Sequence, residues 1–163
     1  MKHIIDCDVL PTPPHNETTI CKHVTHGRLV WDKDRQKEAL YICKGQYGQD
    51  SMPAMDILTE LRDKPVLNAN VLEYLLNNQD AIPNEWRNEN LFYMFWGTLY
   101  YNHAESMTYV RSLHFYPDRR SSLHSPDLEP DGGREGWRSS LRWLERHLLG
   151  SELSNNYVAV LRA

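Results

Sequence analysis

The hydrophobic pattern is strongest in residues 91–116, where two runs rich in aromatic and β-branched residues flank a polar break at residues 102–106. This pattern predicts a β-hairpin with a longer loop. Strict alternation along its first arm places one set of side chains on a single face: Phe92, Met94, Trp96, Thr98 and Tyr100. Both faces of the hairpin are apolar, so we expect it at the centre of a sheet. Gly97 in mid-strand indicates a bulge or a close backbone approach.

Shorter apolar runs predict further strands. The expected strands are His3–Val9, Thr18–Val24, Arg28–Trp31, a buried strand at Ala39–Cys43, and a closing strand at Tyr157–Leu161. Between them, the charged residues 32–38 predict a solvated loop or a short helix. The two glycines of residues 44–50 predict a flexible loop.

Two amphipathic helices are expected between these strands. Ser51 as N-cap and Pro53 in the first turn predict a helix at residues 52–62, which Asp63 to Pro65 end. Asn68 or Asn70 is expected to cap a second helix through about Asn77. We expect both helices to pack on one side of the sheet, with the indole of Trp86 against the helix pair.

The segment 135–149 fits two patterns. A helix would place Trp137, Leu141, Leu144 and Leu148 on one side, whereas a strand would alternate Trp137, Ser139, Leu141 and Trp143. The helix fits better over the longer window. The preceding residues, 116–134, are rich in proline, serine, aspartate and glycine and predict a long mobile loop.

These elements together predict one domain over residues 1–163, of the α+β class. Its mostly antiparallel sheet would be centred on the 91–116 hairpin, with two or three helices packed against it.

Four blocks of sequence carry a resemblance to other proteins. KPVLNANVLEYLL, IPNEW, FWGTLYY and YVRSL, all within Lys64 to Leu113, resemble in order and spacing the core pattern of a group of small uncharacterised bacterial proteins. The resemblance implies the hairpin and the two-helix unit, and it implies no activity. In that group the tryptophan-rich segment near the C-terminus looks like a strand. The group's hairpin loop is rich in glycine and aspartate, whereas residues 102–106 contain no glycine.

Composition is that of a soluble globular protein, with 40% hydrophobic and 25% charged residues. We expect a cytoplasmic protein without membrane association, because no apolar run approaches a spanning length and the N-terminus lacks a signal-peptide pattern. Three cysteines in a reducing compartment are expected to be buried thiols rather than a disulfide framework.

Charge is distributed unevenly although the net value is only −4. Residues 111–163 use arginine and no lysine, which suits bidentate contact with carboxylates or phosphates. The candidate partner-binding residues are Arg119, Arg120, Arg134, Arg138, Arg142 and Arg146, of which the last four would form a stripe along the expected helix. Interleaved acids weaken this stripe, and a solvated helix face with internal salt bridges is the alternative.

Two clusters could carry chemistry. Cys21, His23 and His26 are zinc-type ligands, although no CxxC or HxxxH pair accompanies them. His103, Glu105 and His114, around the hairpin loop and its second arm, could serve acid–base chemistry or could be ordinary polar residues.

No nucleophile elbow and no glycine-rich phosphate loop is present. We therefore expect a non-catalytic interaction protein with a macromolecular partner, most simply a protein. An accessory factor of a phage or mobile element, such as an inhibitor of host defence, would suit such a chain. The alternatives are a zinc-binding domain or metal-dependent enzyme using the Cys21 region, and an RNA or single-strand nucleic-acid binding module.

Overall fold

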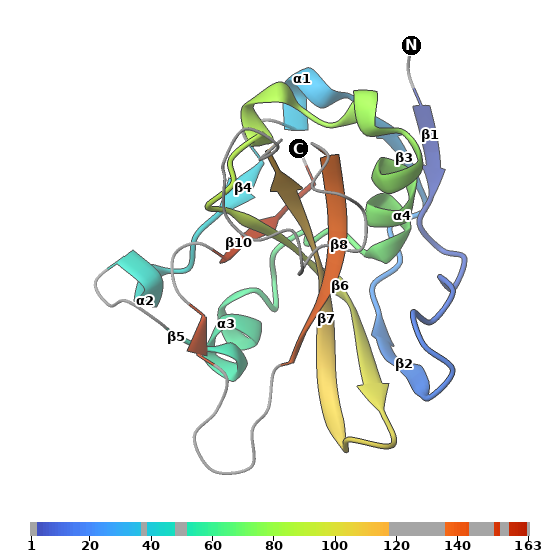
Figure 1. Ribbon diagram of the computed structural model, residues 1–163, viewed down its shortest axis with the longest axis vertical. Helices are drawn as coiled ribbons and strands as arrows, with labels where there is room; N and C mark the ends of the chain where they lie inside the picture. The colour runs from blue at the N-terminus through green and yellow to red at the C-terminus, as the bar shows by residue number, and fades with distance from the viewer. Residues whose placement is uncertain are drawn as a thin grey trace, which may run out of the picture.

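The computed structural model describes residues 3–36, 39–47, 52–117, 136–143, 152–153 and 157–162. Its centre is a six-stranded sheet in the order β4-β10-β6-β7-β8, with β2 also paired to β6 (Figure 1). The strands are β2 (Thr18–His23), β4 (Leu40–Tyr41), β6 (Phe92–Asn102), β7 (Met107–Tyr116), β8 (Gly136–Trp143) and β10 (Tyr157–Val160). Only β10 and β6 pair in parallel among the described strands. The α+β class with a mostly antiparallel sheet is confirmed.

The β6–β7 hairpin lies inside this sheet, as its two apolar faces predict. Its register shifts between Met94 and Leu99, around Gly97. The Gly97 N–H donates to the Leu67 carbonyl at 2.9 Å, and a Cβ at position 97 would lie only 2.8 Å from that oxygen. Both the bulge and the close backbone approach are therefore confirmed.

The bulge reverses which face the later side chains of β6 occupy. Met94 and Trp96 share a buried cluster, whereas Tyr100 packs with Ala69 on the opposite face. Thr98 lies on that opposite face too, because its hydroxyl accepts the Ala69 N–H at 3.0 Å. The single face predicted for Phe92 to Tyr100 is wrong beyond Gly97, since extra residues in one strand shift its alternation.

Helices α3 (Ala54–Glu60) and α4 (Ala69–Asn77) cover opposite faces of the sheet (Figure 1). Ile57 of α3 packs in the cluster of Met94, and Leu72 of α4 packs in the cluster of Tyr93. Met94 and Tyr93 are adjacent in β6, so their side chains point to opposite faces. The prediction that both helices lie on one side is wrong.

Of the two predicted helix starts, that of α4 is confirmed and that of α3 is wrong. Asn68 is the N-cap of α4, as expected, with its side chain accepting the Asn70 N–H. Helix α3 begins later than predicted, because Met52–Pro53 form β5, which pairs with β9 (Glu152–Leu153). The predicted N-cap, Ser51, lies outside the described residues.

The N-terminal strands form a separate two-stranded sheet of β1 (His3–Asp6) and β3 (Arg28–Trp31). Its inner face buries Ile5 and Leu29. Short helices follow at α1 (Lys33–Gln36) and α2 (Lys44–Tyr47). The expected loop at residues 44–50 thus starts as a helical turn, and β4 is only half-buried.

Two 3₁₀ turns, η1 (Gln79–Ala81) and η2 (Asn84–Trp86), connect α4 to β6. Trp86 is fully buried and stacks on Tyr93, with ring centroids 4.7 Å apart. No described helix is long and apolar enough to cross a membrane.

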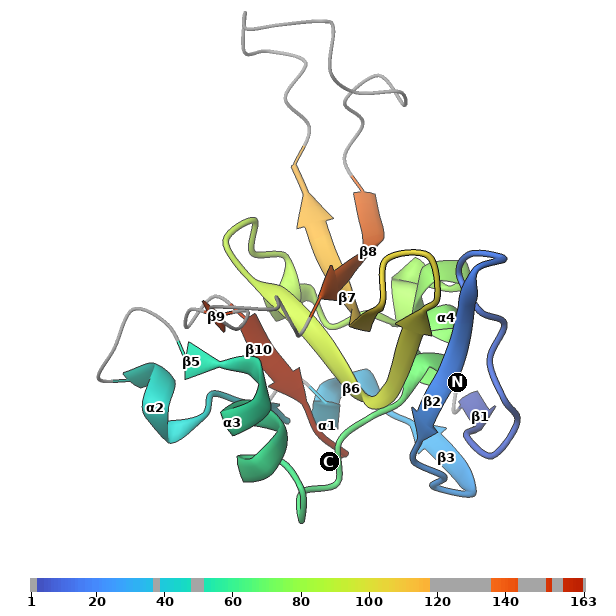
Figure 2. The same cartoon turned by 90° about the horizontal axis from the view of Figure 1, so that it is seen from below.

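Strand β8 replaces the helix expected at residues 135–149. It pairs antiparallel with β7 over its whole length, from Tyr116↔Gly136 to Tyr109↔Trp143 (Figure 2). The helix prediction is wrong, because the segment is extended and pairs with β7. This pairing packs Trp137 beside Phe115. Residues 144–149 and most of the predicted 116–134 loop lie outside the described residues.

Candidate functional site

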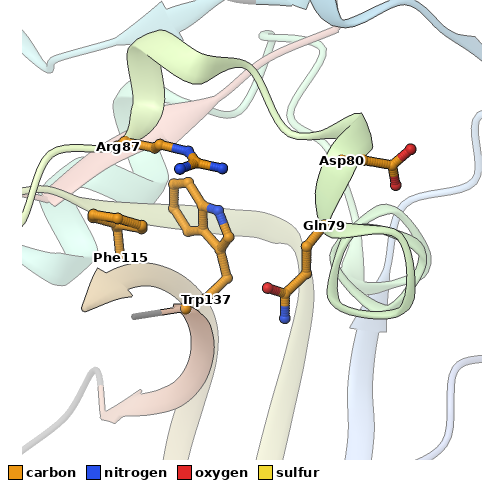
Figure 3. A pocket seen from close by; sticks show the side chains of 6 residues that line it. Gln79, Asp80, Arg87, Phe115 and Trp137 are labelled. Atoms are coloured by element: carbon orange, nitrogen blue, oxygen red, sulfur yellow. The ribbon is translucent and has the colours of Figure 1, made fainter. Parts of the chain in front are cut away.

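A pocket of about 460 Å³ lies beside the last residues of β7 (Figure 3). It brings together η1, the residue after η2, and the paired ends of β7 and β8. The residues that line it are Gln79, Asp80, Arg87, Phe115, Gly136 and Trp137. Its volume is in the range usual for ligand sites, about 300–1,000 Å³.

The floor of this pocket is aromatic. Phe115 and Trp137 are register partners whose ring centroids lie 5.2 Å apart, and both rings are buried. Trp137 also meets Tyr93 edge-on at 6.0 Å. The Arg87 guanidinium carbon lies 5.6 Å from the centroid of Phe115. The pocket therefore places a cation over a firmly packed aromatic surface.

The Trp137 indole nitrogen is buried and has no hydrogen-bond partner among the described residues. In Figure 3 the nitrogen edge of the ring faces the space between Arg87 and Gln79. A buried donor left unsatisfied costs roughly 1–3 kcal/mol. The arrangement suits a hydrogen-bond acceptor placed beside the indole.

A second arginine–aromatic contact lies on the other face of the same strands. The Arg138 guanidinium carbon is 4.7 Å from the Tyr116 ring centroid. Tyr116 meets His114 edge-on, and His114 stacks on Phe92. We call the group Arg87, Phe115, Tyr116, Trp137 and Arg138 the β7–β8 end.

The arginine stripe predicted along a helix takes a different form. Arg138 and Arg142 occupy the register positions of β8 that pair with His114 and Val110 of β7. The side chain of Arg142 is not among those described. Four further candidates lie outside the described residues: Arg119, Arg120, Arg134 and Arg146.

The predicted zinc ligands have other partners. His23 Nε2 lies 3.1 Å from the Cys7 carbonyl and His26 Nε2 2.6 Å from the Val66 carbonyl. A carbonyl oxygen only accepts, so both nitrogens carry protons and neither can ligate a metal as placed. Cys21 is exposed at the register shift of β2. Within the described ranges, no group of three or more His, Cys, Asp or Glu side chains could hold a metal ion.

The other two cysteines are buried. Burial raises the pKa of Cys7 to about 11 and that of Cys43 to about 12. A thiolate is the form that ligates metals and attacks electrophiles. At neutral pH both side chains are therefore thiols that act as small apolar groups.

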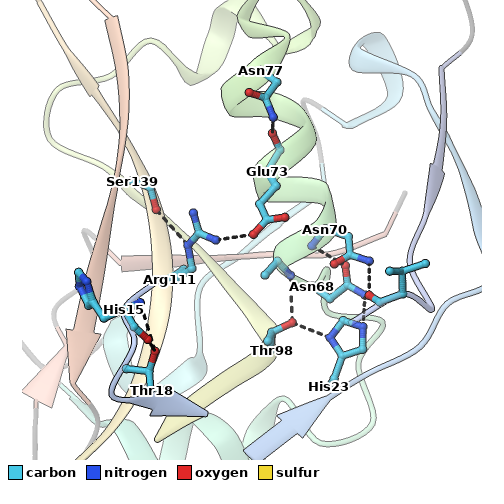
Figure 4. A network of polar contacts seen from close by, with 12 residues as sticks. His15, Thr18, His23, Asn68, Asn70, Glu73, Asn77, Thr98, Arg111 and Ser139 are labelled. Atoms are coloured by element: carbon cyan, nitrogen blue, oxygen red, sulfur yellow. Dashed lines mark hydrogen bonds and ion pairs between the residues drawn. The ribbon is translucent and has the colours of Figure 1, made fainter. Parts of the chain in front are cut away.

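Asn68 is the centre of a polar network that joins four segments (Figure 4). Its side-chain Nδ2 donates to the Cys7 carbonyl at 2.8 Å and to the Val24 carbonyl at 2.9 Å, and its Oδ1 caps α4. His23 Nδ1 lies 2.9 Å from the Thr98 hydroxyl, which accepts the first N–H of α4. Because these groups satisfy one another, the network holds the N-terminal segment against α4 and β6.

Arg111 links α4 to the sheet within the same view (Figure 4). Its guanidinium lies 2.9 Å from a Glu73 carboxylate oxygen, and its Nε is 3.4 Å from the Ser139 hydroxyl. The Arg111 side chain is 12% exposed. Arg111 therefore links α4, through Glu73, and β8, through Ser139, to its own strand β7.

The proposed acid–base residues are not brought together. His103 lies in the hairpin turn and contacts the Thr19 hydroxyl at 3.0 Å. Glu105 accepts a hydrogen bond from Tyr109. His114 pairs with Phe92 at the opposite end of the hairpin, and its Nδ1 meets the Leu91 carbonyl at 2.9 Å.

Sequence reasoning missed Arg87 and Gln79, which lie in turns with no motif of their own. Trp137 was expected to be a buried residue of a helix, and only the alternative strand pattern places it beside Phe115. The signal that could have found the pocket is the pairing of two aromatic strand ends, at Phe115 and Trp137.

Comparison with protein-family models, with curated proteins and with solved structures finds no significant match to this chain. The candidate site therefore stands on its own geometry.

Proposed function

We propose that this is a non-catalytic interaction protein that binds a protein partner through the β7–β8 end. One observation carries the proposal: an arginine guanidinium lies over an aromatic ring on each face of this end, Arg87 over Phe115 and Arg138 over Tyr116. Arginine and aromatic residues dominate the binding energy of many protein interfaces.

Pre-ordering of these side chains supports the proposal. Phe115 and Trp137 are held by the core, so little rotamer freedom remains for them to lose on binding. A partner would therefore meet a surface whose large side chains are already in place.

Charge favours a protein partner over a nucleic acid. The chain carries a net charge of −4, which opposes non-specific attraction to a phosphate backbone. An acidic patch on a protein can still engage the two arginines locally. The nucleic-acid alternative stays open as an outcome of the test that follows.

The test begins with tagged protein and an extract of its native host. A captured partner is purified, and its affinity is measured by calorimetry for wild type and for Arg138→Glu. Loss of a central interface arginine costs about 2 kcal/mol or more, so we expect binding to weaken by about 30-fold or more. Arg28→Glu, at an exposed position on the separate β1–β3 sheet, should leave affinity unchanged.

Two results would overturn the proposal. One is equal affinity of wild type, Arg138→Glu and Arg87→Glu for the captured protein. The other is a captured ligand that nuclease removes and whose affinity falls steeply with salt, since this would identify a nucleic acid.

A further inference from the structure

We infer that the pocket beside Trp137 takes a carboxylate-bearing side chain of an acidic peptide segment, with the carboxylate between the Arg87 guanidinium and the Trp137 Nε1–H. This inference rests on the proposed protein-binding function and names the chemistry of the partner. Its basis is the group of donors that line one cavity.

Three side chains with donor groups line the pocket. Arg87 presents only donors, Trp137 Nε1–H is a donor, and the Gln79 amide can donate as well. Figure 3 shows the indole nitrogen turned toward the space between Arg87 and Gln79. A planar carboxylate matches a guanidinium in geometry and charge.

The unsatisfied indole distinguishes this place from the rest of the core. Trp86 Nε1 is also buried without a partner among the described residues, but Trp86 lines no part of this pocket. Trp137 is 5% exposed, and its nitrogen is shielded from water. Gln79, which lines the same pocket, is exposed and can change rotamer when a ligand binds. Binding would then satisfy a donor that is unsatisfied in the free protein.

The other properties of the lining residues favour particular chemical groups next to the carboxylate. Phe115 and Trp137 offer an apolar floor, which favours a carboxylate attached to an apolar or aromatic group. Asp80 points away from Trp137 in Figure 3. Its charge disfavours a small multiply charged anion such as phosphate, whereas a peptide can donate a backbone N–H to it.

Indole NMR tests the inference directly. The chain has five tryptophans, so ¹⁵N-labelled protein gives five Nε1–H resonances, and Trp137→Phe identifies one of them. The probe is N-acetyl-phenylalaninate, and its neutral amide is the matched control. We expect the carboxylate to move the Trp137 resonance in a saturable way, with an affinity at least about tenfold tighter than that of the amide. The resonance of Trp31, which donates to the Ala81 carbonyl, should not move.

Arg87→Gln removes the charge at an exposed position, so it tests the site even if Trp137→Phe fails to fold. We expect this variant to lose at least about tenfold in affinity for the carboxylate while the amide is unaffected. Equal response to carboxylate and amide, or an unchanged affinity in Arg87→Gln, would overturn the inference. If Arg138→Glu still weakens the captured partner in that case, the proposed function survives and only the pocket chemistry is wrong.

Discussion

Asn68 shows how one buried side chain can join distant parts of a chain. A sequence pattern predicts its local role as the cap of α4, because an Asn before an apolar helix is a common N-cap. It does not predict the bonds to Cys7 and Val24, which lie 61 and 44 residues away in the chain. Those partners depend on the tertiary fold, which local patterns do not contain.

Asn68→Ala should therefore cost far more than the loss of an ordinary cap. It removes the cap and leaves two buried carbonyls without this donor, so we expect a loss of about 3 kcal/mol in the free energy of unfolding. Urea denaturation measures it. Asn77→Ala, at an exposed position of the same helix, should cost less than about 1 kcal/mol. Similar losses in both variants would contradict the role assigned to Asn68.

Gly97→Ala tests the close approach of β6 to the segment before α4. The added Cβ would lie 2.8 Å from the Leu67 carbonyl oxygen and 2.9 Å from the Asn68 Cα, and neither backbone atom can move freely. We expect a loss of about 2–3 kcal/mol by thermal or urea unfolding, typical of overpacking. Gly136→Ala, whose nearest added contact is an ordinary 4.0 Å, should change stability little. A neutral Gly97→Ala would show that the backbones are not in contact.

The buried cysteines predict how stability depends on alkaline pH. The folded pKa of Cys43, about 12, exceeds the ordinary value of 9.0, so the unfolded chain loses this proton first. The resulting stability is complete below pH 9 and is lost as pH rises toward 12, at about 1.4 kcal/mol per pH unit. Cys43→Ala should reduce this slope between pH 9.5 and 11. The exposed Cys21→Ser is the control, and equal slopes in wild type and Cys43→Ala would contradict the assignment.

At the scale of elements, long periodic segments were predictable and segments that depend on a neighbour were not. The β6–β7 hairpin and α4 follow from their own residues. The bulge at Gly97 was expected, but its effect on the faces of β6 was not, because strict alternation assumes an unbroken pleat. The sequence of β8 also fits the spacing of a helix. The segment forms a strand because it pairs with the edge of β7 that is not paired with β6.

Strand β8 gives a direct spectroscopic prediction. Residues 136–143 should show extended-backbone chemical shifts and cross-strand nuclear Overhauser contacts between Leu113 and Ser139 and between Phe115 and Trp137. These contacts follow because paired residues across an antiparallel ladder lie close together. Helical shifts over residues 136–143, with only sequential contacts, would restore the helical stripe of arginines.

At the scale of the whole molecule, the sheet is covered on its two faces by different helices. Helix α4 packs over Tyr93 and Leu113, and α3 packs over Met94 and Val110. The aromatic hairpin, whose density of tyrosine and phenylalanine invites a functional reading, is thus mostly core. Its last residues reach the pocket, where Phe115 meets β8 and the turns after α4.

The outer face of the β1–β3 sheet is a second candidate for the binding surface. Ile4 and Val30 are register partners on the outer face of the β1–β3 sheet, 64% and 50% exposed. Exposed apolar pairs of this kind also occur at interfaces. The central claim is that the partner instead covers the β7–β8 end.

Hydrogen–deuterium exchange of the protein with and without its captured partner tests that claim most directly. We expect binding to slow exchange in residues 79–87 and 136–143, which border the pocket, and to leave residues 3–6 and 28–31 unchanged. Slowed exchange confined to the β1–β3 sheet, with residues 79–87 and 136–143 unaffected, would contradict it.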